Sequence, residues 1–189
     1  MISEQELLEK ASARGRRNYK ANCRRKQPSG LVNGQRSCEV SGFSVGIVKV
    51  SHGGCGPIAV YNALLAAGRG ESFPLIVMGF ERYALRAGGL LGGDPDKMEN
   101  FFNQCKIAAI KSEGYEDFVS VMKAVKVGII CYWTAKPGRS LLHFAAVVNM
   151  GEKGYAVCNR FSDRKTPSAV RSIEAFCTED RFVNGFFLS

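Results

Sequence analysis

The sequence lacks any long, uninterrupted apolar run, and this absence excludes a membrane-spanning helix. Such a helix needs about 20 consecutive apolar residues, and no stretch of the 189-residue chain approaches that length. The N-terminal residues, MISEQELLEK, are acidic and lack the apolar core of a secretory signal. We therefore expect a cytoplasmic protein without a membrane span.

Histidines and closely paired cysteines are also scarce. The chain has two histidines, and its seven cysteines never occur at Cys-x-x-Cys spacing. An odd number of unpaired cysteines gives little support to a disulfide framework or a structural zinc site. We expect reduced, mostly buried thiols, and neither a metal nor an organic cofactor is implied.

The remaining composition is that of one ordinary domain. The chain is 46% apolar and 23% charged, which is close to the average for globular proteins and excludes collagen, coiled coil and wholesale disorder. A chain of this length can build a hydrophobic core without covalent support.

Positive charge is concentrated near the N-terminus. The formal net charge is +9, and residues 1–30 carry eight Lys or Arg against three Glu. Such a segment can contact nucleic acid, an anionic membrane surface or an acidic partner. Its single aromatic residue, Tyr19, does not make a stacking platform for bases, which disfavours nucleic acid. The favoured interpretation is a solvated helix face and arm, with an acidic protein as the alternative partner.

Helix-capping and turn-forming residues near the N-terminus suggest that the chain divides into an N-terminal segment and a domain. Ser3 and Glu6 form a capping-box pattern for a helix that reaches about residue 21. The following QPSGLVNG stretch has the composition of a linker. We therefore predict a basic helix, arm and linker in residues 1–40 and a separate domain in residues 41–189, so that a chain starting near Leu31 should stay folded.

The period of the apolar residues changes along the domain, with helices first and strands second. A strand is predicted over residues 42–50, and a short helix over residues 172–180. The other helices are predicted over about 57–68, 74–86, 95–105 and 115–125, and the other strands over 128–134, 141–149, 154–161 and the C-terminal residues. Helices followed by an antiparallel sheet indicate an α+β fold.

Cys55 has a setting that no other cysteine in the chain shares. Glycines flank it in SHGGCGP, directly before the predicted helix. The N-terminus of a helix presents unpaired N–H groups and a positive field, which favour thiolate over thiol. The glycines let other groups approach the sulfur closely. Cys55 is therefore the candidate nucleophile.

A thiolate nucleophile usually works with an imidazole. His143 lies in the predicted strand LLHFAAVVN, and Asn159 lies 16 residues later, across the MGEKG hairpin. Adjacent antiparallel strands can bring two such side chains within hydrogen-bond reach, and an amide there would fix the imidazole tautomer. Cys55, His143 and Asn159 are thus a candidate nucleophile, base and orienting group.

These residues resemble the papain-like cysteine peptidases, and most closely the branch of bacteriocin-processing, double-glycine peptidases. The matching stretches are GGCGPIAVYNALLAAG, LLGGDPDKMENFF, LLHFAAVVN and VCNRFSD, which follow one another in the family's order within residues 43–189. The resemblance implies a papain-like fold in which a helical layer carries Cys55 and an antiparallel sheet carries His143 and Asn159. It also implies those three residues as the catalytic triad.

The chain departs from the family in two places. Bacteriocin-processing members usually have Asp as the third triad residue, so Asp163 is the fallback for Asn159. The family also has a Gln a few residues before the nucleophile as an oxyanion donor, whereas KVSHGGC contains none. Ser51 and His52 are the candidates to replace it, together with the Cys55 main-chain N–H.

The predicted function is that of a thiol-dependent hydrolase, a cysteine peptidase that cleaves a peptide or protein substrate through a thioester. Two alternatives stay open. The same triad can transfer the acyl group to an amine, which would make the protein an acyltransferase. The missing Gln also allows a papain-like scaffold of little activity that binds a peptide or protein.

Overall fold

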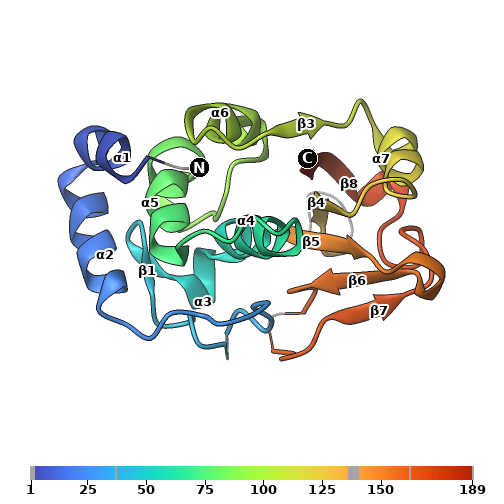
Figure 1. Ribbon diagram of the computed structural model, residues 1–189, viewed down its shortest axis with the longest axis horizontal. Coiled ribbons are helices and arrows are strands. Elements are labelled where there is room, and N and C mark those ends of the chain that lie inside the picture. The colour runs from blue at the N-terminus through green and yellow to red at the C-terminus, as the bar shows by residue number, and fades with distance from the viewer. Residues whose placement is uncertain (1–2, 37, 136–140, 162, 189) are drawn as a thin grey trace.

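The structure, a computed structural model, describes residues 3–36, 38–135, 141–161 and 163–188. A layer of helices packs on an antiparallel sheet (Figure 1), as the predicted α+β class requires. The helices are α1 Glu4–Lys10, α2 Ala13–Cys23, α3 Val50–Gly53, α4 Cys55–Ala66, α5 Phe73–Tyr83, α6 Met98–Gln104 and α7 Tyr115–Val121. Short 3-10 turns are η1 Ala87–Gly89, η2 Pro95–Lys97, η3 Gly151–Lys153 and η4 Glu179–Arg181.

The strands form a small hairpin and one large sheet. The hairpin strands are β1 Ser44–Val45 and β2 Val48–Lys49, and the large sheet holds β3 Ala109–Lys111, β4 Val127–Trp133, β5 Leu142–Asn149, β6 Tyr155–Cys158, β7 Ser168–Val170 and β8 Phe182–Leu188. Their order across the large sheet is β3-β8-β4-β5-β6-β7. Each neighbouring pair is antiparallel, as predicted.

Three of the predicted elements differ in the structure. The first helix is interrupted at Ser12, whose hydroxyl accepts a hydrogen bond from the Gly15 N–H and so caps a second helix. The strand predicted over residues 42–50 is instead the β1–β2 hairpin, because Gly46 has a φ of +59° and turns the chain. Residues 172–180 form turns that lead into η4, not the predicted short helix.

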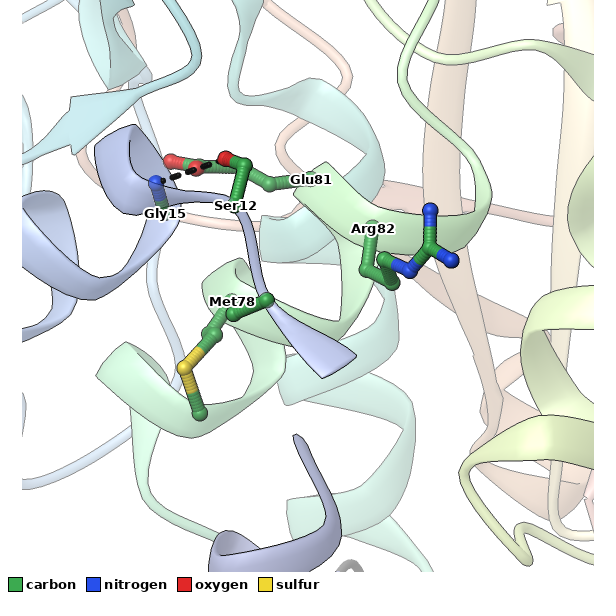
Figure 2. A pocket seen from close by; sticks show the side chains of 6 residues that line it. Ser12, Gly15, Met78, Glu81 and Arg82 are labelled. Carbon is green, nitrogen blue, oxygen red and sulfur yellow. Dashed lines mark hydrogen bonds between the residues drawn. The ribbon is translucent and has the colours of Figure 1, made fainter. Parts of the chain in front are cut away.

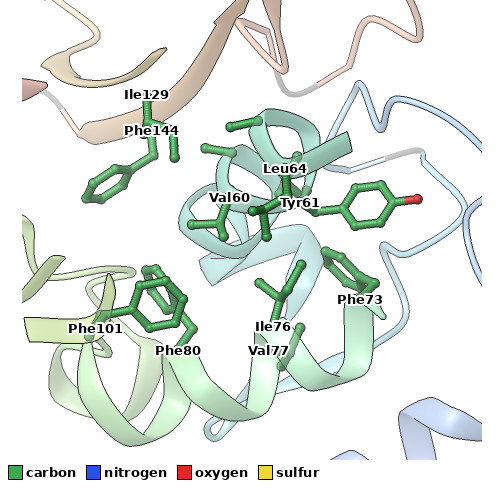
Figure 3. Packing of buried hydrophobic residues seen from close by; sticks show 14 of the residues in the cluster. Val60, Tyr61, Leu64, Phe73, Ile76, Val77, Phe80, Phe101, Ile129 and Phe144 are labelled. Atoms are coloured by element: carbon green, nitrogen blue, oxygen red, sulfur yellow. The ribbon is translucent and has the colours of Figure 1, made fainter. Parts of the chain in front are cut away.

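Helix α4 is the centre of the core. Every residue from Cys55 to Leu64 is buried, and the helix packs against β5 on one side and α5 on the other. Figure 3 shows Val60 and Leu64 of α4 between the sheet residues Ile129 and Phe144 and the α5 residues Ile76, Val77 and Phe80. Burial of each large aliphatic side chain stabilises the fold by about 1.5–3 kcal/mol, so the packing holds the start of α4 firmly in place.

The approach of α5 to the start of α4 requires a glycine. A Cβ atom at Gly56 would lie 2.2 Å from Cζ of Phe80, which is a severe overlap. The Cys-Gly-Pro sequence therefore has a packing role as well as the chemical role predicted for Cys55, because the absence of a side chain at Gly56 lets α4 and α5 pack closely.

The N-terminal helices pack on this core. The α1 residue Leu7 is only 3% exposed and belongs to the main apolar cluster, as does Ala11. The Asn22 side chain pairs with β1 as a strand would, accepting from Ser44 N and donating to Ser44 O, both at 2.9 Å. The segment predicted to be a separate arm is thus joined to the domain by apolar and polar contacts.

Glu81 of α5 joins α2 to the β1–β2 hairpin. Its Oε1 accepts from Asn18 Nδ2 at 2.9 Å and from Gly46 N at 2.8 Å. Figure 2 shows Glu81 beside Ser12 and Gly15, at the start of α2. Burial raises the pKa of the Glu81 carboxyl, although both hydrogen bonds and the charge of Arg14 oppose this rise.

We predict that Leu7→Ala lowers the free energy of unfolding by about 2 kcal/mol, the low end of the range for a buried leucine. Glu9→Ala, at an exposed position of the same helix, is the matched control and should change it by less than about 0.5 kcal/mol. Urea denaturation followed by circular dichroism measures both. Equal, negligible effects would show that α1 is the solvated arm expected from the sequence.

Candidate active site

The site is located where β5 extends past β6. The pairing of these strands ends at Ala146 and Cys158, so that His143 and Phe144 lie beyond the end of β6. The chain leaves β6 at Asn159, whose main-chain carbonyl lies 2.5 Å from His143 Nε2. The uneven length of the two strands therefore brings His143 and Asn159 together, as the hairpin argument predicted.

This contact sets the tautomer of the imidazole. A carbonyl oxygen only accepts hydrogen bonds, so Nε2 of His143 carries the proton that it donates to Asn159 O. Nδ1 is therefore the ring nitrogen that remains for the side-chain hydrogen bond between His143 and Cys55. The predicted nucleophile and base are thus in direct contact.

Cys55 is the first residue of α4 and is only 7% exposed. Burial alone would raise the pKa of its thiol, but the hydrogen bond and charge of His143 outweigh burial, together with the Phe144 and Gly56 N–H groups. The pKa of Cys55 is therefore lower than that of an ordinary cysteine. The Phe144 N–H can reach the sulfur because β6 has already ended.

The pKa of His143 moves in the opposite direction. Burial lowers it, but the hydrogen bond and charge of the Cys55 thiolate raise it more, with a further contribution from the Asn159 carbonyl. A lowered thiol pKa beside a raised imidazole pKa favours the thiolate–imidazolium pair, the form that a nucleophilic cysteine needs.

The other buried cysteines have raised thiol pKa values, in contrast to Cys55. Burial raises the pKa of Cys105 and Cys158 to about 12 each and that of Cys177 to about 11, and it raises the pKa of Cys131 as well. These thiols stay protonated at neutral pH. Burial therefore cannot account for the Cys55 thiolate, which depends on His143.

The Asn159 side chain does not make the contact predicted for it. Its Oδ1 accepts from the Gln35 N–H at 3.0 Å, while its own main-chain N–H donates to Asn33 Oδ1 at 2.8 Å. Its φ is +58°, a left-handed conformation that asparagine tolerates better than most residues. The side chain thus fixes the main chain of Asn159, and the main-chain carbonyl orients His143.

Residues 32–35 form a strap beside Asn159, and this strap is anchored to α4. Asn62 of α4 accepts from Val32 N and donates to Val32 O, both at 2.8 Å. Asn33, Gln35, Asn62 and Asn159 are all buried. Figure 1 shows the chain running from the end of α2 along the lower side of the molecule toward the sheet. The strap therefore ties the helix that carries Cys55 to the residue that holds His143.

Sequence reasoning assigned these strap residues to a linker. Gly, Asn and Pro around Asn33 are typical of a turn, and the contacts with Asn159 span more than 120 residues, so no local spacing predicts them. The signal available in the sequence was the pair of amide side chains at Asn33 and Gln35. An isolated linker would leave both without hydrogen-bond partners in the protein.

The other predicted site residues lie at the edge of this arrangement. Ser51 and His52 contact each other, with Ser51 Oγ 3.2 Å from His52 Nδ1, and His52 is exposed. Asp163 is exposed too, and the bond that orients His143 comes from Asn159. The main-chain carbonyl of Asn159 therefore occupies the orienting position for which Asp163 was the fallback.

In the part of the chain that the structure describes, no three His, Cys, Asp or Glu side chains gather as metal ligands do. None of its helices combines the length and apolar composition that a bilayer crossing requires.

No protein-family model matches the chain, and no curated protein has a similar sequence. The functional assignment therefore depends on the residues and contacts described above.

We predict that Cys55 stays reactive in Asn159→Gly, because glycine keeps the carbonyl and adopts a φ of +58° freely. The lost bond to Gln35 should slow alkylation of Cys55 by about tenfold or less, the equivalent of one neutral hydrogen bond. Asn33→Ala should have an effect of similar size, because it leaves the buried Asn159 N–H unpaired.

Alkylation rates of the folded variants test this prediction, with the exposed Asn100→Ala as the control. If folded Asn159→Gly is as unreactive as His143→Ala, the side-chain amide orients the imidazole and the carbonyl assignment is wrong.

Proposed function

We propose that the protein is a papain-like thiol hydrolase that cleaves a peptide or related amide bond. The observation that carries the proposal is the hydrogen-bonded pair of Cys55 and His143, in which the thiol pKa is lowered and the imidazole pKa is raised. Two further features support it: the sulfur lies at the start of a buried helix, and the imidazole is held by Asn159.

The first chemical step is attack of the Cys55 thiolate on the substrate carbonyl carbon, which forms a tetrahedral oxyanion. The His143 imidazolium then donates its Nδ1 proton to the leaving amine, and the C–N bond breaks to give a thioester. Neutral His143 next takes a proton from water, which attacks the thioester. Collapse of the second tetrahedral intermediate releases the carboxylic acid and restores the thiolate–imidazolium pair.

The oxyanion needs hydrogen-bond donors near the nucleophile. The first main-chain N–H groups of a helix have no partner within the helix, and we assign the Cys55 N–H as the first donor. Ser51 and His52 are the proposed sources of the second donor, because KVSHGGC holds no glutamine. Thiol alkylation does not report on these donors, so the proposal must be tested by peptide turnover as well as by thiol reactivity.

We predict that limiting iodoacetamide labels Cys55 before the exposed Cys23 near neutral pH. The lowered pKa of Cys55 should place its alkylation midpoint below the value of about 8.5 for an ordinary cysteine. In His143→Ala, burial of Cys55 remains while the imidazole is lost, so the midpoint should move upward and peptide hydrolysis should cease. Mass spectrometry of the labelled protein measures both effects across pH.

Turnover separates the proposed hydrolase from its alternatives. A peptide mixture should give cleavage products and a covalent adduct on Cys55, and Cys55→Ala should give neither. Products joined to an added amine would indicate an acyltransferase. A reactive Cys55 without adduct or products would favour a peptide-binding module, and labelling of Cys23 or Cys38 with Cys55 untouched would contradict the catalytic assignment itself.

A further inference from the structure

The chain that leaves the site after Asn159 carries a cluster of arginines stacked on aromatic rings. The Arg160 guanidinium lies 4.9 Å from the ring centroid of Phe161 and 5.6 Å from that of Phe176. The Arg164 guanidinium lies 4.8 Å from the centroid of Phe161. Two guanidinium groups thus share one ring, directly beside the residue that holds His143.

Aromatic contacts connect this cluster to the imidazole. The Phe176 ring packs edge-on against Tyr132 at 5.8 Å, and the Tyr132 ring packs edge-on against His143, also at 5.8 Å. A third guanidinium, that of Arg181, lies over Tyr132 at 5.6 Å and is fixed by a hydrogen bond from its Nε to Trp133 O. The Tyr132 ring therefore lies between Arg181 and His143, and the rings of Phe176 and Tyr132 lie between Arg160 and His143.

This cluster remains accessible from solvent. Phe161 is 38% exposed although it is a large apolar residue, Arg164 is exposed, and Arg160 is half-buried. Asp163 lies in the same segment, which has Lys165 as a further cation. Residues 160–165 thus carry three cations, Arg160, Arg164 and Lys165, and one carboxylate, Asp163.

Stacking on a ring prepares a guanidinium to bind a carboxylate. The ring contacts a face of the guanidinium and limits its motion, while N–H groups on its edge stay directed outward. A planar carboxylate can accept two of these N–H groups at once. Arginines ordered in this way lose less conformational entropy on binding than mobile lysines do.

We propose that the site selects peptides that carry an acidic side chain close to the scissile bond, with Arg160 and Arg164 binding that carboxylate. The proposal rests on the proposed function, since it takes the Cys55–His143 pair as the point of cleavage. Arg181, which is tied to the main chain of β4, contributes to the positive field and not to the direct contact.

The test uses a library of octapeptides in which one Asp is moved through every position, with matched Asn peptides. Binding to the full-length Cys55→Ala variant is measured by calorimetry, and cleavage by the unaltered protein is measured as kcat/KM. The variant pair is Arg160→Gln with Arg164→Gln. The control is Arg82→Gln, because Arg82 also stacks on a ring, that of Tyr83 at 5.6 Å, but lies on α5.

We expect the best Asp peptide to bind about tenfold more tightly than its Asn partner, corresponding to two partly exposed charge contacts. Loss of both arginines should reduce this ratio to about two, Arg82→Gln should leave it unchanged, and 0.5 M salt should weaken it. Cys55 alkylation should be the same in all these arginine variants.

Equal binding of Asp and Asn peptides, or a preference that survives the loss of both arginines, would overturn the inference about the substrate. Cleavage of such peptides without charge preference would leave the proposed hydrolase intact. An unreactive Cys55 would instead contradict the proposed function, and alkylation distinguishes that failure from an absent acidic preference.

Discussion

The left-handed main chain of Asn159 is the constraint on which the geometry of the site depends. With a φ of +58°, this residue leaves β6 and presents its carbonyl to His143. Hydrogen bonds with Asn33 and Gln35 hold it there, because a non-glycine residue in this conformation needs support from its surroundings. The strap is in turn bound to Asn62 of α4, so one network fixes the nucleophile and the base relative to each other.

Because the site is buried, this network determines whether the Cys55 thiol ionises. Away from water, a thiol resists ionisation, as the raised pKa values of Cys105 and Cys158 show. Cys55 is also buried, yet its pKa is lowered because His143 and two main-chain N–H groups face the sulfur. A small displacement of the imidazole would therefore remove the main source of thiolate stabilisation while the desolvation cost remained.

Much of the helical layer and sheet could be predicted because its signals are local. Pro57 and the apolar run after Cys55 mark α4, and the alternation around His143 marks β5. The sequence could not show which group of Asn159 orients His143, because this residue offers both a side-chain amide and a main-chain carbonyl. The strap was missed for a different reason: its partners are distant in the chain, and its composition is that of a turn.

The pKa of His143 tests the central claim most directly, because the claim is that His143 and Cys55 form a coupled ion pair. Ring nitrogen shifts followed by NMR across pH, in the unaltered protein and in Cys55→Ser, measure it. The account predicts a raised imidazole pKa that falls below its ordinary value in Cys55→Ser, where burial is no longer opposed by a thiolate. An imidazole pKa that is the same in both proteins would contradict the account.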